Sequence, residues 1–153
     1  MHHGPVPDET FEARATALTG AQRVLLRAIV DRLRARGTVV TWRGGERIGT
    51  TDDGQPVYEM RYADYSEDAL ALLGTLGRFD LVVPFDWPAW MGEVATRVGA
   101  GCEPGAVRTA LGVADAMRYV TCIVRSDRFA EGAFGAAIED GSLLDALDVV
   151  LAT

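Results

Sequence analysis

The segment formed by residues 115–124 constrains the fold of this chain most, because it is apolar around most of a helical circumference. Met117, Val120 and Ile123 recur at helical spacing within it. A helix that is hydrophobic on most sides must be surrounded by other elements, since a single-faced helix would expose half of that surface to water. We therefore expect this helix at the centre of the core, running directly into the charge-dense residues 125–132.

Several further segments are predicted to be helices that surround this centre. Thr19 and Gln22 form a capping-box pattern before an amphipathic stretch that ends near Gly37. Ser66 is a candidate N-cap for a helix that ends near Gly77. Ser142 is expected to cap the last helix. With shorter helical patterns near residues 11–18, 87–98 and 134–141, the sequence predicts five to seven helices.

One region departs from the helical pattern. Residues 38–42 and 56–62 are rich in β-branched and aromatic side chains, and the glycines between them are typical of turns. This pattern predicts a small two-stranded antiparallel hairpin near residues 38–62, which is too small to be stable without support from the helices. The predicted fold class is therefore helix-dominated α+β.

Chain length and hydropathy indicate one domain. The 153 residues are 48% hydrophobic, which suffices for a core without disulfides or a structural metal. We expect a flexible N-terminus at residues 1–8 and a single globular domain at residues 9–153. No apolar run approaches the roughly 18 residues of a membrane helix. A cytoplasmic protein without membrane contact is therefore predicted.

Residue types that are missing limit the chemistry. The chain has no lysine, and its two histidines are His2 and His3. The domain therefore lacks the histidine of nucleophile pairs and metal sites and the lysine of Schiff bases and phosphate loops. We expect no metal and no cofactor. Cys122 lies in an apolar run and is expected to be a buried, inert thiol, whereas Cys102 lies in an expected loop.

The net charge of −7 opposes binding to nucleic acid, which depends on neutralising phosphates with clustered basic residues. All fifteen positive charges are arginines, and five of them lie on the helix predicted within residues 19–37. We interpret these five as the solvated face of an amphipathic helix.

Residues 83–90 form the first candidate site, with the sequence Val-Pro-Phe-Asp-Trp-Pro-Ala-Trp. Proline suits the first turn of a helix, so a helix should begin at Trp87 or Pro88 with Asp86 as its cap. The functional interpretation is an aromatic platform, Trp87 and Trp90, beside the Asp86 carboxylate. The structural interpretation is a capped turn with both tryptophans in the core, and it is the favoured one.

The second candidate site comprises Arg125, Asp127, Arg128 and Glu131. If the helix continues through them, Asp127 and Glu131 lie one turn apart and Arg128 can pair with Glu131. Two carboxylates flanked by arginines could perform acid/base chemistry or hold an anion. They could equally form a salt-bridge network that ties the core helix to its neighbours, and we favour this structural interpretation.

Three stretches carry a resemblance to a known family: residues 83–90, residues 125–132 and the segment Gly-Ser-Leu-Leu-Asp-Ala-Leu at residues 141–147. Together they resemble a family of small bacterial proteins with a conserved domain of unknown function, from about residue 56 to the C-terminus. The resemblance implies no catalytic residues. It implies that the two candidate sites belong together and touch in the fold.

The leading hypothesis is a non-enzymatic bacterial binding or regulatory module. Its surface would combine the Asp86 carboxylate and the aromatic residues Trp87 and Trp90 with the charged group at residues 125–131, and it would bind an unknown protein or small-molecule partner. A homodimer is an open alternative for the partner. The rival hypothesis is a small metal-independent enzyme that uses carboxylates and arginines. Nucleic-acid binding through the arginine-rich helix is the least favoured.

Overall fold

The computed structural model describes residues 5–98 and 112–153, and this part of the chain contains seven helices and four short strands. The helices are α1 (Asp8–Thr16), α2 (Gly20–Arg36), α3 (Glu67–Arg78), α4 (Trp87–Val98), α6 (Val113–Ser126), α7 (Ala133–Glu139) and α8 (Ser142–Leu151). The strands are β1 (Val40–Arg43), β2 (Arg47–Thr50), β3 (Pro56–Tyr58) and β4 (Tyr62–Tyr65). The predicted helix-dominated α+β fold is confirmed. Within the described ranges, no helix combines the length and apolar character that crossing a bilayer requires.

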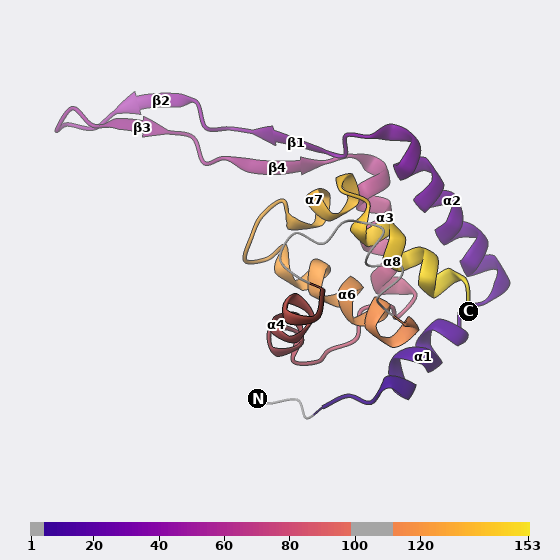
Figure 1. The fold of residues 1–153 in the computed structure, drawn as a ribbon. Coiled ribbons are helices and arrows are strands. Elements are labelled where there is room, and N and C mark those ends of the chain that lie inside the picture. The colour runs from indigo at the N-terminus through magenta and orange to yellow at the C-terminus, as the bar shows by residue number, and fades with distance from the viewer. Residues whose placement is uncertain (1–4, 99–111) are drawn as a thin grey trace.

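Helix α6 lies at the centre of the helical body, as its apolar sequence predicts. It packs against α1, α4, α7 and α8 (Figure 1). Its inward side chains, including Met117 and Val120, are fully buried in one core with Phe11 of α1 and Phe134 of α7. Val6 also packs against this core, while residues 1–4 lie outside the described part of the chain. The division of the chain into residues 1–8 and 9–153 stays a prediction.

Local capping sets the starts of two helices as predicted. Thr19 Oγ1 accepts a hydrogen bond from the Gln22 amide at 3.1 Å, and Gln22 Oε1 accepts one from the Thr19 amide at 2.9 Å. Ser66 Oγ accepts from the Ala69 amide at 3.2 Å at the start of α3. Each cap satisfies amides that the first helical turn leaves without partners.

The four strands form one long hairpin, residues 40–65, which we call the arm. β1 pairs antiparallel with β4, with Val40 opposite Tyr65 and Trp42 opposite Ala63. β2 pairs antiparallel with β3. In Figure 1 the arm runs from α2 and α3 over the edge of α7 and then extends well beyond the helical body. The predicted support by helices therefore holds for the base of the arm and not for its outer half.

The predicted hairpin is correct in its position and antiparallel pairing, but each of its strands is divided. The expected second strand, residues 56–62, consists of β3 and the start of β4, and the expected connector contains β2. The interruption falls at Gly44 and Gly45, both at positive φ (77° and 82°). A Cβ on Gly44 would lie 2.2 Å from the Met60 carbonyl oxygen, so only glycine allows the two strands to approach at this point.

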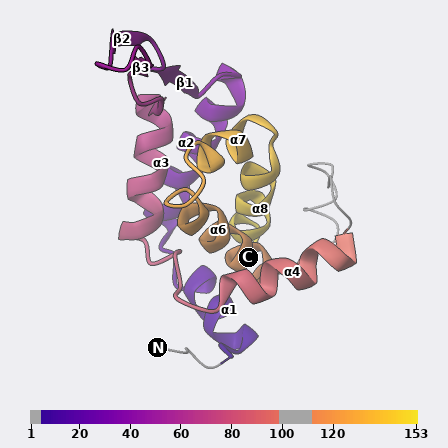
Figure 2. The same cartoon turned by 90° about the vertical axis from the view of Figure 1, so that its left-hand side faces the viewer.

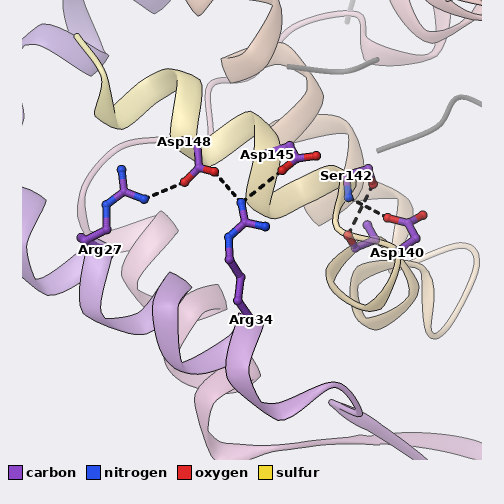
Figure 3. A network of polar contacts seen from close by, with 7 residues as sticks. Arg27, Arg34, Asp140, Ser142, Asp145 and Asp148 are labelled. Atoms are coloured by element: carbon purple, nitrogen blue, oxygen red, sulfur yellow. Dashed lines mark hydrogen bonds and ion pairs between the residues drawn. The ribbon is translucent and has the colours of Figure 1, made fainter. Parts of the chain in front are cut away.

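Arginines of α2 hold α8 against it (Figure 3). Arg27 pairs with Asp148 at 2.6 Å, and Arg34 pairs with Asp145 at 3.1 Å and Asp148 at 2.5 Å. Two further arginines of the helix, Arg32 and Arg36, pair with Asp68 of α3. The exposed face of α2 is therefore largely neutralised by aspartates of neighbouring helices.

The prediction that Ser142 caps α8 is wrong. The N-cap is Gly141, and the Ser142 amide instead donates to Asp140 Oδ1 at 2.8 Å (Figure 3). The Ser142 hydroxyl is buried, accepts from the Tyr119 hydroxyl at 2.7 Å and donates to the Ala137 carbonyl at 3.4 Å. The hydrogen bonds to the half-buried Tyr119 phenol and to the Ala137 carbonyl thus engage the hydroxyl that would otherwise have capped the helix.

Candidate functional site

The charged group at residues 125–131 holds the base of the arm. Helix α6 ends at Ser126, so Asp127 and Glu131 lie in the turn that follows the helix. The prediction that they lie one helical turn apart is therefore wrong. Asp127 Oδ1 accepts from the Tyr65 hydroxyl at 2.5 Å and from the Phe134 amide at 3.1 Å. Glu131 Oε1 accepts from the Ala63 amide at 2.9 Å. Both carboxylates therefore bind β4 or α7 rather than arginines.

The predicted salt-bridge network among the four charged residues is wrong. Arg125 and Arg128 form no ion pair with any residue that the structure describes, and neither Asp127 nor Glu131 has an arginine partner there. The physical reason is that the hydroxyl and amides of the arm base occupy these carboxylates. In place of a charge network, the turn joins the arm to the core helix through charge-assisted hydrogen bonds.

Two glycines allow the base of the arm to pack closely against the helical body. A Cβ on Gly132, which lies at φ +92°, would fall 2.5 Å from Cζ2 of Trp42. A Cβ on Gly135 would fall 2.8 Å from the Tyr65 ring and 3.0 Å from Val40. The inner face of the β1–β4 ladder thus rests directly on the backbone of the turn and of α7, at a distance that a side chain would prevent.

Glu139 also binds the base of the arm, and the sequence interpretation missed it. Its Oε1 accepts from the Val39 amide at 3.0 Å and from the Val40 amide at 3.3 Å. The sequence contains no signal for this role, because the residues lie about a hundred positions apart and Glu139 sits in an ordinary helical pattern. Glu131, Asp127 and Glu139 together fix the base of the arm to the body.

The aromatic motif divides between core and surface. Helix α4 begins at Trp87 as predicted, and Asp86 Oδ1 accepts from the Ala89 amide at 3.4 Å, a long capping contact from an exposed side chain. Trp90 is 8% exposed, packs edge-on against Phe85 and donates through Nε1 to Asp115 at 3.2 Å. The structure therefore places Trp90 in the core, as the structural interpretation has it.

Trp87 is the point at which the two motifs meet. Its ring lies 6.3 Å from that of Phe129, at an interplanar angle of 33°. Its carbonyl accepts a weak contact from Cys122 Sγ at 3.8 Å. Phe129 belongs to the second motif and is 82% exposed, the least buried aromatic side chain with a ring contact. The sequence interpretation did not select Phe129; its signal was a phenylalanine between charged residues in a turn.

Two arginines close to this aromatic contact in the chain form no ion pair with a described residue. Arg128 precedes Phe129 in the chain, and Arg125 lies three residues after Cys122 on the same side of α6. On the other side of the turn, Arg61 lies over the Trp42 ring at 4.6 Å and forms no ion pair among the described residues. Figure 2, which views the side toward which the arm projects, shows the α6–α7 turn between the base of the arm and α4. We call this region the Trp–Arg surface, defined by Trp42, Arg61, Trp87, Arg125, Arg128 and Phe129.

Burial changes the acidity of two groups near this surface. Desolvation, followed by the hydrogen bond to the Asp127 carboxylate, raises the pKa of Tyr65 well above its ordinary value of 10.0. Desolvation alone raises the pKa of the Cys122 thiol to about 12. The phenol therefore remains a hydrogen-bond donor, and the buried thiol remains protonated and unreactive at neutral pH. Cys102 lies outside the described residues.

The described cavity is remote from these residues. It has a volume of about 370 Å³, opens between α2 and the end of α8, and is lined by Arg23, Val24, Arg27, Ala28, Asp31 and Leu151. None of the residues selected from the sequence lines it. Within residues 5–98 and 112–153, no group of three or more histidine, cysteine or acidic side chains is placed to hold a metal ion.

Comparison with known proteins gives one match. The model of the Family of unknown function (DUF6508) matches residues 19–152, which includes α2, the arm and every helix that follows. No curated protein and no solved structure matches the chain.

Proposed function

The chain belongs to the Family of unknown function (DUF6508), and from the geometry of its Trp–Arg surface we propose that it is a non-enzymatic binding module that recognises an acidic, partly apolar segment of a partner protein. The observation that carries the proposal is the contact between Trp87 and the exposed Phe129, beside two arginines without ion pairs in the described chain.

Charge and exposure support an acidic partner. In a chain of net charge −7, most arginines near carboxylates pair with them, as those of α2 do. Arg125 and Arg128 have no such partner among the described residues, although Glu131 and Asp86 are exposed in the same region. A guanidinium is weakly hydrated, pairs bidentately with carboxylates and stacks on aromatic rings. Aromatic residues and arginine are also the types enriched at the centres of protein interfaces.

The roles of the carboxylates support binding over catalysis. Asp127 and Glu131 accept hydrogen bonds from the arm base, and Asp86 accepts from an amide of α4. A general acid or base needs a carboxyl group that faces a cavity and reaches a substrate proton. None of the three lines the cavity between α2 and α8. Among the described residues, no observation therefore favours the enzyme hypothesis over the binding module.

The arrangement of α2 supports a protein partner over a nucleic acid. Arg27, Arg32, Arg34 and Arg36 each pair with an aspartate of α3 or α8. Contact with phosphates would require breaking these pairs in a protein whose overall charge repels phosphate. A cytoplasmic location and a bacterial origin stay predictions.

A titration with two matched peptides tests the proposal. One peptide alternates glutamate with tyrosine and valine, and the other carries lysine in place of each glutamate. The three tryptophans give three indole signals in a ¹H–¹⁵N spectrum. We expect the acidic peptide to shift the signals of Trp87 and Trp42 and to leave that of the buried Trp90 unchanged.

The matched variant is the double substitution Arg125→Glu/Arg128→Glu, at two side chains without ion pairs among the described residues. It should weaken binding of the acidic peptide about ten-fold or more, because an opposite charge at an interface becomes a like charge. Equal shifts with the lysine peptide, or no effect of the double substitution, would reject the proposed function.

A further inference from the structure

The outer part of the arm, residues 46–60, exposes apolar side chains that no described residue of the chain covers. We call it the distal arm. Every residue of β2 and β3 is exposed. Ile48 is 66% exposed, Tyr58 60% and Met60 84%, with Val57 beside them at 37%. A two-stranded ribbon alone is marginal in water, so a ribbon that carries this much apolar surface gains stability from a partner.

The distal arm cannot reach its own body. Glu131, Asp127 and Glu139 fix the base of the arm, and Gly132 and Gly135 hold the inner face of β1–β4 against the turn and α7. From this fixed base the arm extends outward (Figure 1). At about 3.3 Å per residue, a strand segment of ten residues spans about 30 Å. The described helical body therefore does not cover these side chains, and a second molecule is the occupant that we consider.

The edges of the distal arm are poorly suited to extension by a further strand. β2 has an irregular register between Arg47 and Gly49, and β3 begins with Pro56, which has no amide hydrogen. Bulges and prolines are devices by which edge strands avoid pairing with other chains. A partner therefore contacts the side chains of the distal arm rather than its backbone edges.

The charge of the distal arm indicates which surface it fits. It contains four carboxylates, Glu46, Asp52, Asp53 and Glu59, and a single arginine, Arg47. None of the four forms an ion pair with a described residue. Arg47 donates within the hairpin, to the Gly49 carbonyl and the Thr50 hydroxyl. The distal arm is thus an acidic, apolar segment, the same chemistry that the Trp–Arg surface is proposed to recognise.

We propose that two copies of this chain exchange their arms, so that the distal arm of each copy binds the Trp–Arg surface of the other. This proposal rests on the proposed function and names its partner. The carboxylates of the distal arm face Arg125 and Arg128 of the second copy, while Tyr58 and Met60 cover Trp87 and Phe129. The α6–α7 turn thereby both fixes its own arm and receives the arm of the second copy.

The size of such an interface is adequate. A stable protein interface buries about 1,600 Å² in total. Exchange around a two-fold axis makes the contact twice, so each distal arm need bury only about 400 Å² of its own surface and as much of the surface that it covers. Four exposed apolar side chains on a ribbon provide an area of this order.

A charge-swap experiment in analytical ultracentrifugation tests the exchange. The arm variant is Asp52→Arg/Asp53→Arg/Glu59→Arg, and the surface variant is Arg125→Glu/Arg128→Glu. We expect the wild-type protein to be dimeric and each variant alone to dissociate about ten-fold or more readily. An equimolar mixture of the two variants should form a dimer again, because one contact pairs the two native surfaces and the other pairs the two reversed ones.

The control variant is Glu12→Arg/Asp31→Arg, which changes charge at exposed positions of α1 and α2 and should leave the dimer intact. Thermal melting followed by circular dichroism verifies that each variant is folded. A dimer that the arm variant abolishes and the surface variant preserves would mean that arms pair with arms, and it overturns the proposal. A mixture that remains monomeric overturns it as well.

Failure of this inference and failure of the proposed function give different results. If the wild-type protein is monomeric but the acidic peptide still shifts Trp87, the surface binds a partner other than a second copy, and only the exchange is refuted. If neither the peptide nor a second copy binds, both proposals fall.

Discussion

The substitution Gly132→Ala tests whether the arm packs directly against the turn between α6 and α7. Gly132 lies at φ +92° and ψ −6°, a region in which alanine costs about 1–2 kcal/mol. Its new Cβ would lie 2.5 Å from Cζ2 and 2.9 Å from Cη2 of Trp42, so the indole must move. Such overpacking costs about 1–3 kcal/mol more. We therefore expect a loss of about 2–5 kcal/mol in the free energy of unfolding, measured by urea denaturation followed by far-UV circular dichroism.

Two controls separate backbone strain from the clash. Gly37→Ala introduces a side chain at positive φ (+71°, with ψ −67°) in open space, so its cost is backbone strain without a clash. In a Trp42→Ala background the indole is absent, and Gly132→Ala should fall to the strain cost of its own backbone conformation, about 1–2 kcal/mol. An equal loss with and without the Trp42 ring would refute the claim that the turn and the arm are in direct contact.

Three further predictions concern Tyr65, Cys122 and the contact between α2 and α8. Tyr65→Phe should cost about 1–1.5 kcal/mol near pH 7, because it removes a half-buried hydrogen bond to a carboxylate. The pKa of Tyr65 is raised in the folded state, so its contribution to the free energy of unfolding is complete below pH 10 and is lost as the pH rises above 10. The stability difference between wild type and Tyr65→Phe should therefore shrink by about 1 kcal/mol at pH 11, allowing for solvent screening. A difference that stays constant with pH would contradict this. In a Cys102→Ser background, Cys122, with a thiol pKa of about 12, should react with a disulfide reagent at pH 8 only at the rate of unfolding, and labelling of the native protein within seconds would show it to be accessible. Arg34→Ala should cost about 1–2 kcal/mol in urea denaturation because two aspartates of α8 each lose one of their ion pairs, whereas the exposed Arg36→Ala should cost less than about 0.5 kcal/mol. Equal effects would argue against the α2–α8 contact of Figure 3.

The helices could be predicted from the sequence because their causes are local. The capping residues Thr19 and Ser66 lie within three positions of the amides that they satisfy, and the apolar spacing of α6 identifies it as the core helix. The start of α4 at Trp87 follows from the proline after it. Where a cap failed, as at Ser142, the competing partner was Tyr119, which lies 23 positions away.

The candidate site could be predicted only in part. Trp87, Arg125 and Arg128 were selected as types of residue that bind partners, and the structure places Trp87 beside the segment that carries both arginines. Which of the two tryptophans would be the more buried was not predictable, because Trp87 and Trp90 lie three positions apart on one helix and their packing against α6 decides that Trp90 is buried and Trp87 only half-buried. Phe129 was overlooked because its exposure depends on where α6 ends.

By itself, then, the sequence determined the helix-dominated class, the starts of α2, α3 and α4 and the place of the hairpin, since these depend on residues within a few positions of each other. Only the tertiary structure decided what Asp127 and Glu131 do. Their partners, Tyr65 and Ala63, lie 62 and 68 positions away and bind these carboxylates in preference to arginines that lie one to three positions away in the chain. The reason is geometric, because the glycines at positions 132 and 135 allow the arm to approach the carboxylates within hydrogen-bonding distance. Arg125 and Arg128 consequently have no ion pair among the described residues.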